Sequence, residues 1–454
     1  MKILIVGAGE VGYHIAGHLA KENKDVVVID NDPDSLRRVS ENLDVQVLLG
    51  SGSSPLALEE AGLSSAEILL AVTNSDETNL VACLVANLIS PSTKKLARVR
   101  DAAFDGYYEH FREKPPYIDT IINPEIEVVK TIDRLMQVPG AVDVAEFADG
   151  RIKFIGVRLT SESPLANLKL MDLHTVLGEC RLLIAAVVRE ERLIIPRGDD
   201  RLIPGDLVYF ISEQDRFLEA LSFFHQEPQA IKRVLIIGGG RIGLRLAEVL
   251  DERSIQCKIV EQQPDRCNLL AERLNKVVVL CGDGSDHSLL AEENIHDVDV
   301  VVTLTDDEET NILSSLLARR MGARKSITKI SKFSYFPLMS AIGIEQVVSP
   351  RLSAINSILQ HIRRGKVISA ISIKGEEAEV MEAVAMETSD IVHKPLKRIS
   401  FPKGAMVAGI IRGETIIIPS GESVIEPEDR IIIFATRKAI PGVEKILAVK
   451  LEYF

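Results

Sequence analysis

The chain has 454 residues, 46% of them hydrophobic, which is enough for several domains of roughly 100–150 residues with cores of their own. Tryptophan is absent and aromatic residues make up only 4%, so aliphatic residues must fill the interior, as in parallel sheets covered by helices on both faces. The net charge of -13 argues against a nucleic-acid partner, because phosphate backbones are bound by basic surfaces.

The cysteine pattern and the N-terminus exclude further classes. The five cysteines form no CxxC pair, so neither a metal centre nor a disulfide framework is expected, and a reducing compartment fits. Met1-Lys2 is followed directly by the apolar run Ile3–Val6 and by glycines, without a signal-peptide pattern. No apolar run approaches the roughly 18–20 residues of a membrane span. We expect a cytoplasmic protein that meets a membrane only through a partner.

The first segment, residues 1–137, alternates strands and helices. Apolar runs predict strands at Lys2–Val6, Asp25–Asp30, Val45–Leu49, Ile68–Val72, Leu96–Val99 and Thr120–Ile122. Amphipathic stretches predict helices over Glu10–Lys21, Asp76–Ile89 and Pro124–Met136, and Pro33 predicts a further helix start after Asn31-Asp32. This alternation indicates a doubly wound, Rossmann-like parallel sheet of the α/β class.

The second segment, residues 141–226, has a different pattern. Val142–Phe147 and Ile152–Leu159 flank Asp149-Gly150, which is a hairpin signal. Further strands are predicted at Leu182–Val188, Leu193–Ile195 and Leu207–Ile211, with a short helix from Asp215. The segment is therefore predicted to be a small α+β domain.

The second half of the chain repeats the first. A third segment, 229–357, carries Gly282-Asp283-Gly284 and Thr305–Asn311 in the places of Gly50-Ser51-Gly52 and Thr73–Asn79. A fourth segment, 366–454, repeats the second, with Asp429 in the place of Asp206. Linkers are predicted near 137–141, 226–232 and 358–366. The sequence thus predicts two Rossmann-like domains, each followed by a small α+β domain.

A glycine-rich loop follows the first strand of each Rossmann-like segment. The two copies are Gly7-Ala8-Gly9-Glu10-Val11-Gly12 and Gly238-Gly239-Gly240-Arg241-Ile242-Gly243. In such a loop the first glycine permits a tight turn, the second lets a pyrophosphate approach the backbone, and the third lets the helix pack close to the sheet. The loop begins a helix, whose N-terminal N–H groups favour phosphate.

An acidic residue follows each loop at the same spacing. Asp30 and Glu261 lie 18 residues after the last glycine, and 231 residues separate Asp30 from Glu261 as they separate Gly7 from Gly238. This register indicates a tandem duplication. A carboxylate at the tip of the second strand can accept hydrogen bonds from a ribose, and it disfavours a 2′-phosphate. The first site is therefore predicted to take NAD(H) or ATP/ADP rather than NADP(H).

Further polar residues are predicted at the crevice. Thr73-Asn74 follow the fourth strand and Arg98 lies in the fifth, at the carboxyl edge of the sheet. In the second copy the candidate residues are Gly238, Gly240, Gly243 and Glu261. Arg241 replaces Glu10 there, and Asp283 and Asp306–Glu309 make the crevice more acidic. Nucleotide binding at the second copy and a duplicated domain kept for packing remain alternatives.

Other candidate sites are weaker. His14 and His18 have the i, i+4 spacing of metal ligands, but a third ligand is lacking, so packing or surface histidines are favoured. The run Asp306–Glu309 could bind a cation, although a cluster that complements a helix dipole is the simpler interpretation. His174, His225 and His393 could serve a dehydrogenase as acid–base groups, yet none lies in a repeated motif. No metal site and no catalytic residue are predicted.

The chain resembles the TrkA family, the cytosolic regulatory subunits of bacterial and archaeal Trk potassium-uptake systems. The resemblance rests on MKILIVGAGEVGYHIAGHLA, VVVIDND, AVTNSDETN, ARVR and IINPE in the first half, and on RVLIIGGGRIG and LTDDEETN in the second. It implies RCK (KTN) nucleotide-binding domains at 1–137 and 229–357, and TrkA-C domains at 141–226 and 366–454.

The resemblance implies regulation rather than catalysis. Family members bind NAD(H) and ATP/ADP, assemble as dimers or tetramers, and dock on the cytoplasmic face of an integral-membrane, potassium-translocating subunit similar to TrkH or TrkG. Their NAD contacts would fall on Gly7–Val11, Asp30, Thr73-Asn74 and Arg98 here. One departure is Gly50-Ser51, where a Gly-Asp pair is usual. A nucleotide sensor for a different transporter and an NAD-dependent dehydrogenase are the alternatives.

Overall fold

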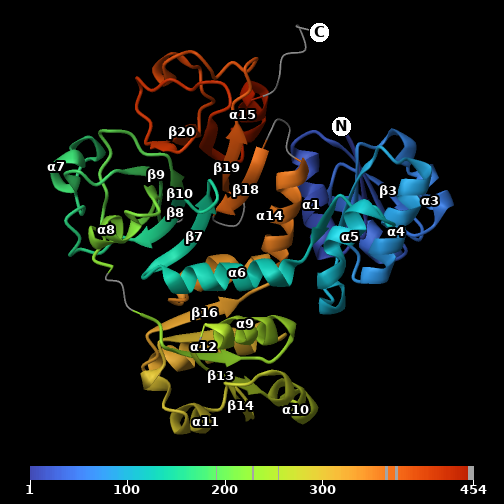
Figure 1. Cartoon of the computed structure of the whole chain (residues 1–454), viewed down its shortest axis with the longest axis horizontal. Coiled ribbons are helices and arrows are strands. Elements are labelled where there is room, and N and C mark those ends of the chain that lie inside the picture. Colours follow the sequence, from blue (N-terminus) through green and yellow to red (C-terminus); the bar gives the residue numbers. More distant parts are fainter. Residues whose placement is uncertain (191, 227–229, 254, 363–366, 374–376, 448–454) are drawn as a thin grey trace. The chain divides into compact units, whose positions relative to one another are not determined.

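The computed structural model describes residues 1–447 apart from 191, 227–229, 254, 363–366 and 374–376 (Figure 1). The described residues form two parallel and two antiparallel sheets, which alternate along the chain. The predicted α/β class, with a small domain after each Rossmann-like sheet, is confirmed. The predicted linkers 226–232 and 358–366 lie partly outside the described residues, as do the first residues of the predicted segments 229–357 and 366–454.

The first sheet has the strand order β3-β2-β1-β4-β5-β6, with parallel pairs throughout. Its elements are β1 (Lys2–Val6), α1 (Glu10–Lys21), β2 (Asp25–Asp30), α2 (Pro33–Asn42), β3 (Gln46–Leu49), α3 (Pro55–Glu60), β4 (Ile68–Ala71), α4 (Asp76–Ile89), β5 (Lys94–Arg98), α5 (Tyr108–Glu113), β6 (Thr120–Ile122) and α6 (Pro124–Gln137). The order reverses between β1 and β4. The carboxyl ends of these two strands therefore frame the crevice in which such sheets bind ligands.

Local sequence signals account for most of these boundaries. Asp32 caps α2, because its carboxylate accepts hydrogen bonds from the N–H groups of Asp34 and Ser35, each at 3.2 Å, and Pro33 occupies the first helical position. Strand β5 begins two residues earlier than the apolar run suggested. The reason is Lys95, a buried side chain whose ammonium donates to the carbonyls of Pro91 and Thr93.

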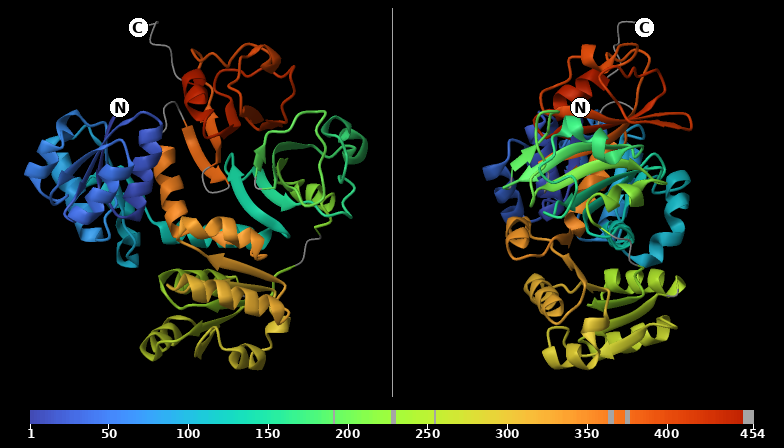
Figure 2. Two further views of the ribbon diagram at one scale, coloured as in Figure 1. Left: turned by 180° about the vertical axis from the view of Figure 1, so that it is seen from behind. Right: turned by 90° about the vertical axis from the view of Figure 1, so that its left-hand side faces the viewer.

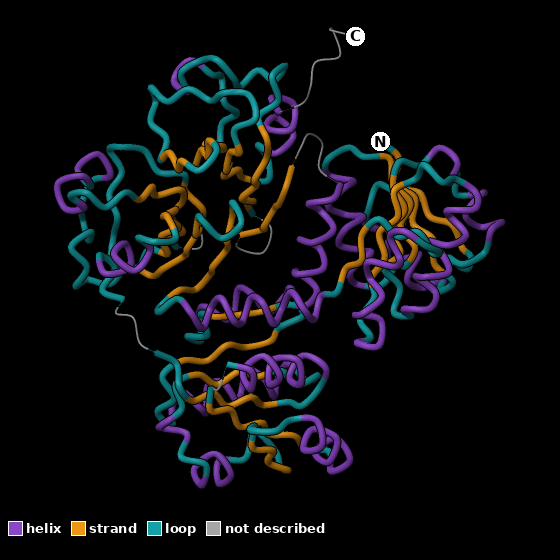
Figure 3. The backbone as a smooth tube through the Cα atoms, viewed as in Figure 1, coloured by secondary structure: helices purple, strands orange, loops and turns teal. Residues whose placement is uncertain are grey.

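The second parallel sheet has the equivalent order, β14-β13-β12-β15-β16-β17. Its elements are β12 (Arg233–Ile237), α9 (Arg241–Glu252), β13 (Gln256–Glu261), α10 (Pro264–Arg273), β14 (Val278–Cys281), α11 (His287–Glu292), β15 (Val300–Thr303), α12 (Glu308–Arg320), β16 (Lys325–Lys329), α13 (Phe336–Ala341), β17 (Gln346–Val348) and α14 (Pro350–Ile362). Figure 3 shows the strands of each parallel sheet with helices alongside them. The identical topology agrees with a tandem duplication.

The chain divides into two compact units, Met1–Glu127 with Pro350–Ile362 and the remainder. The division does not follow the predicted segments. Helix α14, predicted to belong to the third segment, lies alongside α1 in the first unit (Figure 1). Its apolar side, including Ala354, Ile355 and Ile358, is buried there. Conversely, α6 from Val128 onward contributes to the core of the second unit.

The end of α14 gives the first unit a pH dependence. Burial, with smaller contributions from the charges of Lys94 and Arg112, lowers the pKa of His361 from 6.5 to about 4. The unfolded chain therefore binds a proton first, and stability should fall as the pH decreases from about 6.5 to 4, by about 2 kcal/mol after allowance for partial solvent exposure. We expect His361→Gln to abolish this component in melting curves across that range. His110→Gln, on the surface of α5, should leave it unchanged; an equal loss in both variants would contradict the assignment.

The small domains are five-stranded antiparallel sheets, β10-β9-β11-β8-β7 and β18-β19-β22-β20-β21. The first contains β7 (Ala141–Phe147), β8 (Ile152–Arg158), α7 (His174–Leu177), β9 (Leu182–Arg189), β10 (Arg192–Ile194), β11 (Leu207–Glu213) and α8 (Phe217–Ser222). The second contains β18 (Val367–Ile373), β19 (Ala378–Val384), β20 (Ala405–Arg412), β21 (Thr415–Ile417), β22 (Arg430–Thr436) and α15 (Ile440–Leu447). Corresponding buried carboxylates accept two hydrogen bonds from an arginine, in Arg189–Asp206 and Arg412–Asp429.

The two small domains share a hydrophobic core within the second unit. Phe154 of the first domain and Phe434 of the second are fully buried and stack with ring centroids 6.2 Å apart. Arg430 also pairs with Asp149 at 2.6 Å. Both views of Figure 2 show the strands of the two domains side by side. The apolar faces of the two small domains therefore pack against each other within the chain.

Candidate nucleotide-binding site

The first glycine-rich loop lies where β1 meets the end of β4. Gly7 has φ +113°, and a Cβ there would lie 2.9 Å from the main-chain nitrogen of Thr73. A Cβ on Gly12 would lie 1.8 Å from the carbonyl oxygen of Gly7. At Gly9, in contrast, no described atom lies within 4 Å of the Cβ position. The fold itself requires the first and third glycines, whereas Gly9 leaves open space at the start of α1.

That open space adjoins the N-terminus of a helix. Gly9 is the N-cap of α1 and has no side chain to cap it. Helix geometry leaves the first N–H groups, such as those of Glu10 and Val11, without acceptors inside the helix. Together with the positive end of the helix dipole, these groups suit the phosphates of a nucleotide.

Asp30 lies beside this loop, as the spacing predicted. Its carboxylate accepts hydrogen bonds from the N–H of Ala8 at 2.5 Å and from the N–H of Asp32 at 2.9 Å. Asp30 therefore joins the glycine-rich loop to the start of α2. Because each carboxylate oxygen can accept two hydrogen bonds, the group retains capacity for ribose hydroxyls.

A second set of predicted residues lies across the crevice and depends on Asn79. The side-chain oxygen of this fully buried asparagine accepts from the N–H and hydroxyl of Thr73, at 2.9 and 2.8 Å. Its amide donates to the carbonyls of Thr73 and Arg98. The Arg98 guanidinium donates to the Thr73 carbonyl at 2.6 Å, and the Asn74 side chain is exposed. Asn79 thus fixes the tips of β4 and β5.

Sequence reasoning missed Asn79, although its recurrence as Asn311 was a usable signal. We expect Asn79→Ala to destabilise the first unit by about 2–3 kcal/mol, because it leaves buried main-chain groups without partners. Nucleotide affinity should fall with it, since Thr73 loses its support. Thermal melting and calorimetric titration would measure the two effects, with the exposed Asn74→Ala as control for stability alone, because Asn74 is itself a predicted nucleotide contact. Equal stability of the two variants would contradict this role.

Arginines near the loop were also missed. The Arg38 guanidinium donates to the Glu10 carboxylate at 2.5 Å, and Arg351 of α14 approaches the other Glu10 oxygen at 3.3 Å. The hydrogen bond and charge of Arg38 help to hold the pKa of Glu10 below its usual range. The predicted contact residue Glu10 therefore places two cations near the start of α1. Arg38 follows Asp30 closely in sequence, but nothing in the sequence linked Arg351 to this site.

The second crevice repeats the geometry of the first. Gly238 has φ +107°, and its Cβ would lie 2.7 Å from the nitrogen of Thr305; a Cβ on Gly243 would lie 2.0 Å from the Gly238 carbonyl oxygen. No described atom lies within 4 Å of the Cβ position at Gly240. Glu261 accepts from the N–H of Gly239 at 2.8 Å, as Asp30 does from that of Ala8.

The acidic run of the second crevice has protein partners. Asp307 caps α12 by accepting from the N–H of Thr310 at 2.7 Å. Glu308 accepts from the N–H groups of Ser331 and Lys332, which follow β16, each at 3.0 Å. The hydroxyl of Tyr335, with Lys332, lowers the pKa of Glu309 to about 2. Asp306 pairs with Lys329, which takes the place of Arg98. These contacts agree with the simpler interpretation of the run as helix capping and surface pairing.

Ser51 and Asp283 occupy corresponding turns in the two halves, and each side chain hydrogen-bonds to the residue two positions later. Asp283 accepts from the N–H and hydroxyl of Ser285, at 2.8 and 2.7 Å. Ser51 pairs its hydroxyl with that of Ser53 at 3.0 Å. Although Ser51 departs from the usual Gly-Asp pair, the turn after β3 is kept, with the Ser51 hydroxyl in the place of a carboxylate.

The described residues contain no group of three or more His, Cys, Asp or Glu side chains arranged to hold a metal ion. His18 is buried with its Nε2 3.0 Å from Glu22, and His14 is half-buried near Glu10. No helix among the described residues is long and apolar enough to cross a membrane.

Fold and site together define a tandem Rossmann-type nucleotide-binding protein with paired accessory domains. Residues 3–124 and 234–350 match the TrkA-N domain family, and residues 154–225 and 380–448 match the TrkA-C domain family. The chain belongs to the TrkA family.

Full-length relatives and solved structures agree. The chain is 39% identical to the Trk system potassium uptake protein TrkA of Halomonas elongata over 100% of both chains. It is 34% identical to that of Haemophilus influenzae over 98% of both. The GsuK RCK domain crystal structure has TM-score 0.61 at 19% identity, covering 98% of this chain and 94% of that chain. The GsuK channel bound to NAD has TM-score 0.60 at 19% identity, covering 98% and 78%. The Halomonas elongata and Haemophilus influenzae relatives are named for potassium uptake rather than for a catalysed reaction, in line with the prediction of no enzyme.

Proposed function

We propose that this chain is the nucleotide-binding regulatory subunit of a Trk-type potassium-uptake system. It binds NAD(H) and ATP/ADP and docks, as a homo-oligomer, on the cytoplasmic face of an integral-membrane, potassium-translocating subunit of the TrkH/TrkG type. The observation that carries the proposal is the open space at Gly9, which adjoins a helix N-terminus and the Asp30 carboxylate in a chain of the TrkA family.

The positions of the arginines support a regulatory mechanism. Arg38 and Arg351 flank Glu10 next to the glycine-rich loop, so nucleotides with different phosphate groups would engage them differently. Arg351 belongs to α14, the helix that precedes the second small domain in the chain. A ligand shifts an equilibrium only by its differential affinity for two states, and coupling of about 1–3 kcal/mol is typical. Arg351 would connect phosphate binding to the second half of the chain.

Transport measurements test the proposal. Rubidium uptake would be measured in cells that carry a Trk-type membrane subunit but lack their own TrkA, with and without this chain. We expect the chain to restore regulated uptake, and the Arg351→Ala variant to restore uptake with a weaker response to ATP and ADP. If the protein binds nucleotides but leaves rubidium uptake unchanged, the result would indicate that it is a sensor for a different transporter.

Asp30 offers a direct test of the cofactor. We expect Asp30→Ala to weaken NADH binding by about tenfold or more, as for loss of a charged hydrogen bond. Asp30→Asn retains an oxygen acceptor for the Ala8 N–H but removes the charge, so it should narrow the preference for NADH over NADPH. Titration calorimetry measures both, with the exposed Asp34→Ala of α2 as control. Unchanged affinity in Asp30→Ala would place the ribose elsewhere.

A further inference from the structure

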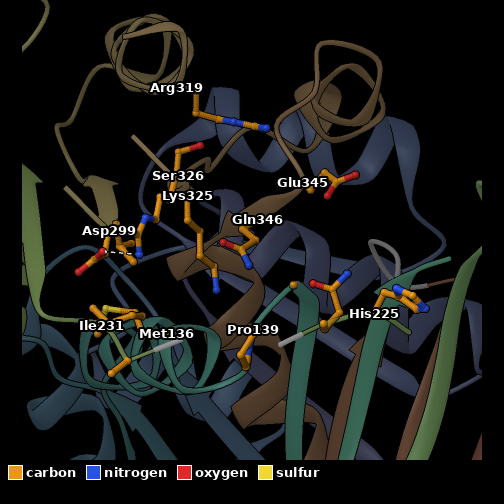
Figure 4. A pocket seen from close by; sticks show the side chains of 15 residues that line it. Met136, Pro139, His225, Ile231, Asp299, Arg319, Lys325, Ser326, Glu345 and Gln346 are labelled. Atoms are coloured by element: carbon orange, nitrogen blue, oxygen red, sulfur yellow. Dashed lines mark ion pairs between the residues drawn. The ribbon is translucent and has the colours of Figure 1, made fainter. Parts of the chain in front are cut away.

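A cavity of about 480 Å³ lies at the amino ends of three strands of the second parallel sheet (Figure 4). The first residues of β15, β16 and β17, which are Val300, Lys325 and Gln346, line it. Other lining residues come from the end of α6 and from the end of the first small domain, including Met136 and His225. The glycine-rich loop follows the carboxyl end of β12, so this cavity is separate from the nucleotide crevice.

Both carboxylates on the cavity wall are already neutralised. Asp299 forms an ion pair with Arg324 at 3.1 Å and accepts hydrogen bonds from two main-chain N–H groups. Glu345 forms an ion pair with Arg158 at 2.6 Å. Neither carboxylate is left to balance the remaining cations of the cavity.

Two cations remain, Lys325 and Arg319. Among the described residues, their hydrogen-bond partners are main-chain carbonyls, that of Leu135 for Lys325 and that of Gly343 for Arg319. Burial lowers the pKa of Lys325 to about 8, so its ammonium is desolvated but charged at neutral pH. A desolvated ammonium without a carboxylate attracts an anion.

Gln346 adds an unsatisfied acceptor. Its side chain is only 6% exposed, and its amide nitrogen donates to the carbonyl of Ala141. Its side-chain oxygen is buried and has no hydrogen-bond partner among the described residues. Because a buried acceptor without a donor is costly, the cavity also favours a ligand with a donor group.

We propose that this cavity binds a small organic anion that carries a hydroxyl group. The anionic group lies against Lys325, with Arg319 as a second cation of the wall, and the hydroxyl donates to the side-chain oxygen of Gln346. Hydroxycarboxylates and phosphate monoesters share this chemistry, and the volume falls within the roughly 300–1,000 Å³ of small-molecule pockets. A bound anion would connect α6, the first small domain and the second sheet within one compact unit.

Matched pairs of probes test the proposal by titration calorimetry of the full chain. Malate and succinate differ by one hydroxyl, and phosphate and sulfate differ by a transferable proton. A Gly9→Val/Gly240→Val background prevents the same anions from binding at the glycine-rich loops. We expect malate to bind more tightly than succinate, or phosphate more tightly than sulfate; which pair binds identifies the ligand class. Malate affinity should fall as the pH rises above about 8, where Lys325 loses its proton.

Substitutions complete the test. Lys325→Met should weaken binding by about tenfold or more, and Arg319→Met, at an exposed position that tolerates change, should also weaken it. Lys276→Met, on the surface and outside the cavity, is the matched control and should bind as the parent does. Absence of binding by all four probes, or equal affinity in the parent and both cavity variants, would overturn the proposal. Equal affinity within both probe pairs would overturn the role of Gln346.

Discussion

Replacement of Gly12 by alanine should destabilise the first compact unit by about 3 kcal/mol or more. The added Cβ would lie 1.8 Å from the carbonyl oxygen of Gly7, a main-chain atom that cannot rotate away. Either α1 moves away from the sheet or the tight turn after β1 opens. Both changes remove the contact between the glycine-rich loop and β4, so nucleotide binding should be lost with stability. Thermal unfolding followed by calorimetry would measure the effect.

Gly9→Ala is the matched control for this substitution. Its Cβ would enter open space, so the melting temperature of the ligand-free protein should change little. Gly243→Ala should reproduce the large effect in the second unit, where the Cβ would lie 2.0 Å from the Gly238 carbonyl oxygen. Similar melting temperatures for the Gly12→Ala and Gly9→Ala variants would contradict the close packing of the loop.

Phe434→Ala should destabilise the second unit by about 3–5 kcal/mol, the usual cost of truncating a buried aromatic ring. Phe434 is fully buried in the core shared by the two small domains and stacks on Phe154. The space left by the missing ring would therefore weaken the association of the two small domains as well as the fold of the second small domain. Leu218→Ala, at a side chain that is 42% exposed, is the control and should cost much less.

A double-mutant cycle distinguishes a shared core from two independent cores. If the rings of Phe154 and Phe434 contact each other, the two alanine substitutions should be non-additive, by about 0.5–1.5 kcal/mol. Additive effects would mean that the two rings are not energetically coupled, which would contradict their contact in a shared core.

The repeated topology was predictable because it depends on local pattern. Apolar runs of strand length, amphipathic helices and the capping residue Asp32 determine β1 to β6 and the helices between them, and the two glycine-rich loops indicate the duplication. The membership of α14 in the first unit was not predictable. It depends on the packing of Ala354, Ile355 and Ile358 against elements some three hundred residues earlier in the chain, and no local pattern records such a partner.

The candidate site was predictable in part for the same reason. Gly7, Gly9, Gly12 and Asp30 act through backbone geometry and fixed spacing, which the sequence shows. Asn79 acts through four hydrogen bonds, three to Thr73 just after β4 and one to Arg98 at the end of β5, and only its recurrence as Asn311 hints at that role. Arg351 reaches Glu10 from a distant part of the chain, so a single sequence gives no sign of it.

The most direct test of the central claim is titration calorimetry of NADH into the wild-type chain, Gly9→Val and Gly240→Val. The Cβ positions at Gly9 and Gly240 have open space around them, so we expect both variants to keep a melting temperature close to that of the wild type, and thermal melting is the check that they fold. We expect Gly9→Val to abolish binding at the first crevice, and the change in stoichiometry in Gly240→Val to show whether the second crevice is occupied. Wild-type affinity and stoichiometry in a folded Gly9→Val variant would contradict the assignment of the nucleotide to the glycine-rich loop.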